Sequence, residues 1–191
     1  MNSEIQTEQR RMNPLIFMLW LLIVSIVMMF AAFTSAYIVR REEGNWLEFD
    51  LPSVLLVNSI VLILSSVFMQ WAYSSAKADN IKNVKLALVL TIVAGVAFLI
   101  GQWAGWGELV KNNVFFGGST SNPSGSFLYV LTGVHAFHLI TGLIFLIIVV
   151  ISALKYKVHS RNLTRIKLCT IYWHFLGALW IYLYVFLVLN H

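Results

Sequence analysis

The sequence predicts an all-α, polytopic membrane protein, a bundle of five transmembrane helices. Of its 191 residues, 59% are hydrophobic and only 11% are charged, whereas a soluble domain carries about 25% charged residues. The apolar residues gather in runs of about twenty or more, a length that crosses a bilayer as a helix. The alternating apolar and polar residues of a membrane β-barrel are absent from the sequence.

We expect a short tail, residues 1–13, followed by a single transmembrane domain, residues 14–191. Pro14 suits the first position of a helix, because its missing N–H would have no partner there. Charged or polar loops separate the apolar runs, and the longest loop contains the turn-forming stretch GGSTSNPSG. The predicted spans are residues 14–39, 52–73, 84–106, 126–154 and 165–189.

The basic residues predict the orientation of the chain in the membrane. Ten of the 13 Lys and Arg residues fall on the side of the N-terminal tail. They are Arg10, Arg11, Lys77, Lys82, Lys85, Lys155, Lys157, Arg161, Arg165 and Lys167. The positive-inside rule then places the N-terminus in the cytoplasm and the C-terminus outside, in the periplasm.

The net charge of +5 does not indicate a nucleic-acid partner, because the basic residues lie in loops, where topology places them. The single cysteine, Cys169, excludes an intramolecular disulfide. The first apolar run is too long for a cleavable signal peptide and is expected to remain as a helix.

Two histidines, His135 and His138, interrupt the fourth apolar run. An ionisable residue inside a bilayer is costly and is a functional-site hypothesis by default. Residues three apart share one face of a helix, and Gly142 continues that face. The pattern predicts a stripe that packs against protein rather than lipid.

The sequence leaves a haem-binding alternative open. His138 and His174 lie near the middle of different spans and could together ligate a haem. Their depths differ by about five residues, or roughly 7 Å, and no carboxylate is available in the membrane to orient either ring. Hydrogen bonding between helices is the favoured interpretation. Because no span carries a central Asp or Glu, proton pumping by this chain alone is not expected.

The fifth apolar run is rich in aromatic residues. Trp173, Gly177, Trp180 and Tyr184 recur at helical spacing and form one stripe. A stripe of this kind is more often a packing surface than a cofactor site. The indole N–H groups still need hydrogen-bond partners at membrane depth, so the stripe is expected to meet another helix or an ordered lipid.

These runs resemble subunit III of haem–copper respiratory oxidases. The fourth is similar to the family segment T-G-x-H-x-x-H-x-x-x-G, and the fifth to the signature W-H-F-x-x-x-x-W. The first, LLIVSIVMMFAAF, is similar to a family helix that reads V-S-E-V-M-F-F-A, and the third keeps the glutamine of Q-x-x-E-Y. The resemblance covers essentially all five spans. The main matching residues are Gln102, Thr132, Gly133, His135, His138, Gly142, Trp173, His174, Phe175 and Trp180.

The resemblance implies the five-helix form of the family, without the first two helices of the seven-helix members. It implies a non-catalytic subunit of a proton-pumping cytochrome c oxidase that reduces oxygen to water in the bacterial inner membrane. The partners would be subunits I and II, membrane lipids and, as a further candidate, a respiratory supercomplex. Haems and copper would belong to the partner subunits, and this chain would bind phospholipid. Subunit and lipid packing would involve His135, His138, Gly142, Trp173, His174, Trp180 and Gln102.

Four positions that are acidic in the family are not acidic here. Ile26, Gly105 and Gly177 replace two glutamates and an aspartate, and Lys167 stands at a fourth usually acidic position. A direct role in proton delivery is therefore in doubt, while a structural and lipid-organising role survives. The alternatives are subunit III of a quinol oxidase and a stand-alone bis-histidine haem protein. A transporter is less favoured, because paired broken helices and midplane charges are absent.

Overall fold

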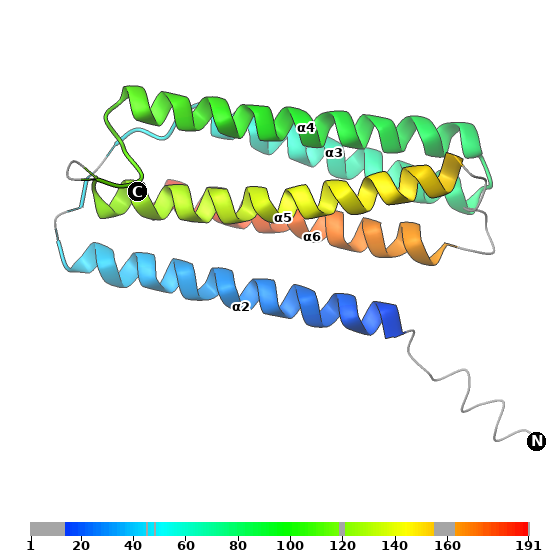
Figure 1. Ribbon diagram of the computed structural model, residues 1–191, viewed down its shortest axis with the longest axis horizontal. Coiled ribbons are helices and arrows are strands. Elements are labelled where there is room, and N and C mark those ends of the chain that lie inside the picture. Colours follow the sequence, from blue (N-terminus) through cyan, green and yellow to red (C-terminus); the bar gives the residue numbers. More distant parts are fainter. Residues whose placement is uncertain (1–13, 45, 48, 119–120, 155–162, 191) are drawn as a thin grey trace, which may run out of the picture.

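The computed structural model describes the chain except residues 1–13, 45, 48, 119–120, 155–162 and 191. The predicted tail and most of the basic loop near residue 160 therefore lie outside the described residues. The described part contains helices and no strand (Figure 1). The helices are α2 (Pro14–Glu42), α3 (Val54–Lys77), α4 (Ile81–Lys111), α5 (Pro123–Leu154) and α6 (Thr164–Asn190). All five are long and apolar enough to cross a membrane, which confirms the predicted fold class.

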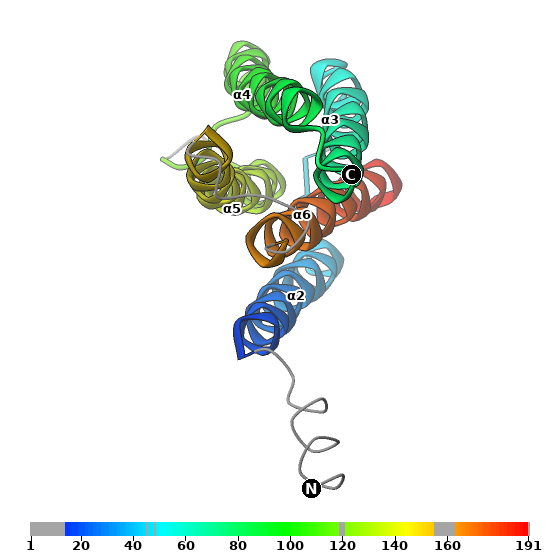
Figure 2. The ribbon, with the colours of Figure 1, turned by 90° about the vertical axis from the view of Figure 1, so that its right-hand side faces the viewer.

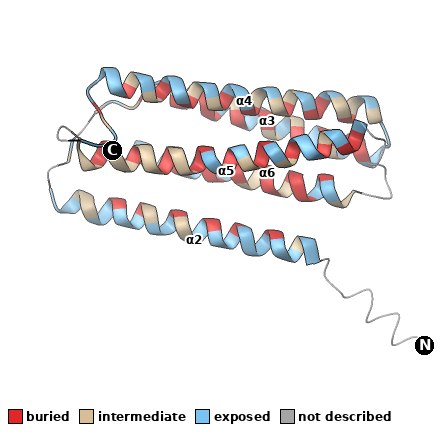
Figure 3. Cartoon of the chain, in the orientation of Figure 1, coloured by how far each residue is buried: buried red, intermediate tan, exposed pale blue. Residues whose placement is uncertain are grey.

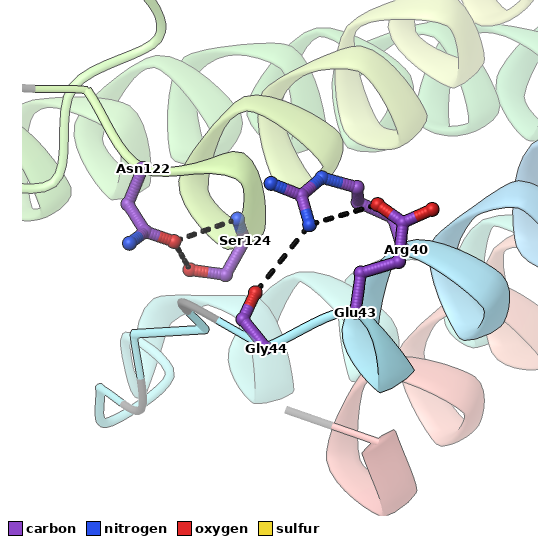
Figure 4. A network of polar contacts seen from close by, with 5 residues as sticks. All are labelled: Arg40, Glu43, Gly44, Asn122 and Ser124. Carbon is purple, nitrogen blue, oxygen red and sulfur yellow. Dashed lines mark hydrogen bonds and ion pairs between the residues drawn. The ribbon is translucent and has the colours of Figure 1, made fainter.

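Side-chain caps explain why two helices begin earlier than the predicted spans. The side chain of Asn80 accepts a hydrogen bond from the Asn83 N–H at 3.3 Å, so α4 begins at Ile81. Before α5, Asn122 Oδ1 accepts from both the backbone N–H and the hydroxyl of Ser124, at 3.1 and 2.9 Å (Figure 4). Each cap satisfies an N–H group that a helix start leaves without a partner.

A short polar network forms where α2 ends, at the same end of the bundle as the start of α5 (Figure 4). Arg40 forms an ion pair with Glu43 at 3.0 Å and donates a hydrogen bond to the Gly44 carbonyl at 3.4 Å (Figure 4). Gly44 has a φ of +84°, a conformation that glycine adopts without strain. The chain can therefore turn sharply after α2.

The helices form a ring of four with one helix outside it. Within the ring, α3 packs on α4, α4 on α5, α5 on α6, and α6 on α3, while α2 contacts only α5 and α6 (Figure 2). In the most apolar window of α6, 50% of the residues are buried, against 17% for α2. Helix α6 is thus the central helix, and most of α2 is exposed (Figure 3).

Candidate functional site at the helix interfaces

The two tryptophans of the predicted aromatic stripe form hydrogen bonds between α6 and α3. Trp173 donates its indole N–H to Ser65 Oγ, and Trp180 donates to Ser59 Oγ, each at 2.9 Å. Both rings are 1% exposed, so each N–H would be costly without this partner. Ser59 was missed, although its spacing of about two turns from Ser65 matches the spacing of the tryptophans.

The two histidines of α5 contact different neighbours. His135 is fully buried inside the four-helix ring, and its ring centroid lies 5.8 Å from that of Phe98 and 5.1 Å from that of Trp180. His138 is half-buried and faces α2, with its centroid 6.0 Å from that of Phe30. Both imidazoles meet protein, but they do not form the single shared stripe that their spacing suggested. The offset between residues three apart is enough to turn them toward different helices.

His138 also bonds to its own helix. Its Nδ1 lies 2.8 Å from the carbonyl oxygen of Val134, one turn earlier. If Nδ1 carries the proton, the imidazole donates to that carbonyl, and Nε2 is left as an acceptor. His138 therefore combines an intrahelical bond with packing against α2.

The glycines of the predicted stripes mark close approaches between helices. A Cβ atom added at Gly142 would lie 2.9 Å from Leu176 Cδ1 of α6 and 3.5 Å from the Trp173 ring. At Gly177 the added Cβ would lie 3.0 Å from Ser66 Oγ of α3. Small residues at such positions let membrane helices pack closely.

His174 faces a different helix from His138. Its Nε2 is 3.2 Å from Gln70 Oε1 of α3, in an exposed pair. His138 faces α2, and α2 makes no contact with α3. The two histidines of the haem-binding alternative therefore contact side chains of different helices, Gln70 of α3 for His174 and Phe30 of α2 for His138.

Gln102 and Asn58 are buried within the ring, at 1% and 3% exposure. Neither Gln102 side-chain atom has a hydrogen-bond partner among the described residues, and neither does Asn58 Nδ2. A Cβ atom at Gly101 would collide with the Asn58 side chain, so this glycine makes room for the amide. The sequence singled out Gln102 but gave no indication that Asn58 lies beside it.

Three of the four positions that are acidic in the similar family are buried here, and the fourth, Lys167, is exposed. Ile26 is 3% exposed, and Gly105 and Gly177 are buried within helix interfaces. A Cβ at Gly105 would lie 3.8 Å from Leu55 Cδ2, an ordinary contact. Among the described residues, no three His, Cys, Asp or Glu side chains lie close enough together to hold a metal ion.

A groove of about 400 Å³ separates part of α2 from α6. Val27 and Ala31 of α2 line it together with Ala178 and Tyr182 of α6. The Tyr182 hydroxyl lies 3.1 Å from Thr34 Oγ1, a hydrogen bond that joins the two helices beside the groove. The lining is otherwise apolar and lies within two membrane-spanning helices.

Comparison with known proteins places this architecture in a family. The family model described as cytochrome c oxidase subunit III matches residues 6–190. The cytochrome c oxidase subunit 3 of Corynebacterium diphtheriae is 29% identical over 167 residues, covering 83% of this chain and 80% of the relative. The rat protein of that name, from Rattus norvegicus, is 30% identical over 179 residues, covering 86% of this chain and 65% of the relative. The cat protein, from Felis catus, is 33% identical over 135 residues, covering 69% of this chain and 48% of the relative. The matched region spans all five helices and the tryptophans, histidines and glycines at their interfaces, and the chain belongs to the cytochrome c oxidase subunit III family.

Proposed function

We propose that this chain is the non-catalytic subunit III of a proton-pumping cytochrome c oxidase that reduces oxygen to water. The family match over residues 6–190 carries this proposal. In the proposed oxidase, subunits I and II are the direct partners of this chain and hold the haems and copper. The chain stabilises subunit I and organises phospholipid around it. It resides in the bacterial inner membrane with its N-terminus in the cytoplasm.

The interfaces described above support a structural role. Several polar side chains join neighbouring helices: Trp173 and Trp180 bond to serines of α3, and Thr141 Oγ1 of α5 lies 3.0 Å from the Tyr172 hydroxyl of α6. Bonds of this kind hold membrane helices together when no hydrophobic driving force acts between them. The chemistry of oxygen reduction is then left to the partner subunits.

The pair of Gln70 and His174 favours the α3–α6 face as the surface that meets subunit I. Gln70 is exposed and His174 is half-buried, and their side chains lie 3.2 Å apart on two membrane-spanning helices. By a rise of about 1.5 Å per residue, His174 lies roughly 15 Å from the start of α6, well inside the bilayer. Polar side chains at that depth rarely face lipid. A partner helix that supplies a polar group would cover the pair.

The groove between α2 and α6 supports the lipid-organising role. Its volume of about 400 Å³ and its apolar lining suit part of a phospholipid acyl chain. An acyl chain held there would fill the space that α2, with contacts only to α5 and α6, leaves at the edge of the bundle.

Copurification tests the proposal. The chain is tagged, extracted in mild detergent and analysed for bound proteins, haem spectrum and oxygen consumption. We expect subunits I and II, a haem–copper oxidase spectrum, and oxygen uptake driven by reduced cytochrome c. Oxygen uptake driven by quinol but not by cytochrome c would assign the chain to a quinol oxidase instead.

The stand-alone haem alternative has its own test. The chain is expressed without the other oxidase subunits and its optical spectrum is recorded. We expect no Soret band. A Soret band that disappears in His138→Ala or His174→Ala would overturn the proposal of a non-catalytic subunit.

A further inference from the structure

Three buried polar side chains from three helices lie at one level inside the four-helix ring. They are Asn58 of α3, Gln102 of α4 and His135 of α5, and we call them the polar layer. Their exposures are 3%, 1% and 0%. Each lies within a membrane-spanning helix, where a polar group without a partner costs several kcal/mol.

Contacts between neighbouring helices show that the three residues lie at the same depth along the bundle. Asn58 lies against Gly101, the residue before Gln102, because a Cβ at Gly101 would collide with the Asn58 amide. Between α4 and α5, the ring of Phe98 lies 5.8 Å from that of His135, and Trp106 donates a hydrogen bond to Thr132 at 3.1 Å. Gln102 is one turn from both Phe98 and Trp106 on α4. It therefore faces α5 at the level of His135.

The fourth helix of the ring, α6, contacts both α5 and α3 at the same level. The ring of His135 lies 5.1 Å from that of Trp180 on α6. Trp180 in turn bonds to Ser59, the residue next to Asn58. The contacts thus run once around the ring and return to α3.

Five side-chain atoms of the polar layer have no hydrogen-bond partner among the described residues. They are Asn58 Nδ2, Gln102 Nε2, Gln102 Oε1, His135 Nδ1 and His135 Nε2. The nearby hydroxyls are already engaged. Ser59 donates to the Leu55 carbonyl and accepts from Trp180, while Thr132 donates to the Leu128 carbonyl and accepts from Trp106. Neither hydroxyl has a proton left to donate to Gln102 Oε1 or to a His135 ring nitrogen, so these acceptors need another donor.

We propose that the polar layer is an internal hydration site, in which ordered water bridges Asn58, Gln102 and His135. The five atoms include both donors and acceptors, and a water molecule donates two hydrogen bonds and accepts two. Buried water typically makes about three hydrogen bonds to polar groups of this kind. The bridges tie α3, α4 and α5 together at one level and fix how the helices face one another. This inference rests on the packing of the chain and is independent of the proposed oxidase function.

Water-edited solid-state NMR of the full, ¹⁵N-labelled chain in phospholipid vesicles tests the site directly. The His135 imidazole signal is assigned by its loss in His135→Phe. We expect this signal to receive magnetisation from water quickly, although the ring is fully buried. The Trp173 indole N–H is the control, because it is buried and bonded to Ser65. Transfer to His135 as slow as transfer to Trp173 would overturn the proposal.

A mutational cycle gives a second, independent readout. His135→Phe and Gln102→Leu each remove one member of the layer and leave its partners unsatisfied. We expect each to lower the thermal midpoint of the purified full chain by about 3 °C or more. The double replacement removes both groups and should recover at least half of the summed loss, because fewer polar atoms remain without a partner. Losses that simply add would overturn the proposal.

Discussion

Trp180 of α6 donates its indole N–H to Ser59 of α3 across 121 residues of sequence, at 2.9 Å. Seven residues earlier, Trp173 makes the same bond to Ser65. The two bonds lie two helical turns apart. They hold the central helix against α3 at two levels within the bilayer.

The first prediction concerns these bonds. Ser59→Ala or Ser65→Ala should lower the free energy of unfolding by about 0.5–2 kcal/mol, because a buried indole N–H loses its acceptor. Thermal unfolding of the purified chain in detergent, followed by tryptophan fluorescence, measures the change. Ser25→Ala, at an exposed serine of α2, is the control and should change little. Equal effects at Ser25 and Ser59 would show that the bonds contribute nothing specific.

The second prediction concerns Gly101. Gly101→Ala should lower the free energy of unfolding by about 1–3 kcal/mol, because the new methyl group collides with Asn58. Gly107→Ala is the matched control on the same helix, since an added Cβ there meets nothing within 4 Å. The double variant Gly101→Ala/Asn58→Ala should regain part of the loss by removing the colliding amide. If Gly101→Ala matches Gly107→Ala in stability, the close approach of α3 and α4 is not a constraint.

The third prediction concerns His138 and rests on the proposed oxidase. His138→Ala removes the ring that packs on Phe30 of α2 and the bond to the Val134 carbonyl. The yield of complete oxidase should fall, while the haem spectrum per assembled complex stays the same. Quantitative immunoblotting and difference spectroscopy on the same preparation measure the two quantities. A haem signal lost from fully assembled complex would instead make His138 a ligand.

The fourth prediction concerns the exposed pair on the α3–α6 face. His174→Ala or Gln70→Ala should weaken retention of subunit I by roughly two- to tenfold, the scale of one hydrogen bond in a membrane. The ratio of subunit I to this chain after detergent washing measures retention. Ile140→Ala, at an exposed position of α5, serves as the comparison. Unchanged retention in both pair variants would mean that subunit I binds another face.

The fifth prediction concerns the groove between α2 and α6. Ala178→Leu places a larger side chain among its lining residues and should reduce the phospholipid that copurifies with the complex. Lipid extraction and mass spectrometry provide the measurement. Ala32→Leu adds the same bulk at an exposed residue of α2 that is outside the groove lining. Lipid loss in both variants alike would argue against binding in the groove.

The sequence alone predicted the five membrane-spanning helices, because their apolar runs are long and the charges are confined between them. It also singled out the residues that became the core of the fold. Trp173, Trp180, His135, Gly142 and Gln102 are all buried. Residue type was sufficient here, since polar or small residues within an apolar run have few roles other than contact between helices.

The tertiary structure decided which helices those residues join. His135 and His138 are three residues apart, yet one faces the ring interior and the other faces α2. Ser59 and Asn58 gained their importance from α6 and α4, which lie far away in the sequence. A helical pattern specifies the face on which a side chain lies, but the neighbour that this face meets depends on how all five helices pack. For this reason the spans could be derived from local hydropathy, while the polar layer and the tryptophan–serine bonds required the assembled bundle.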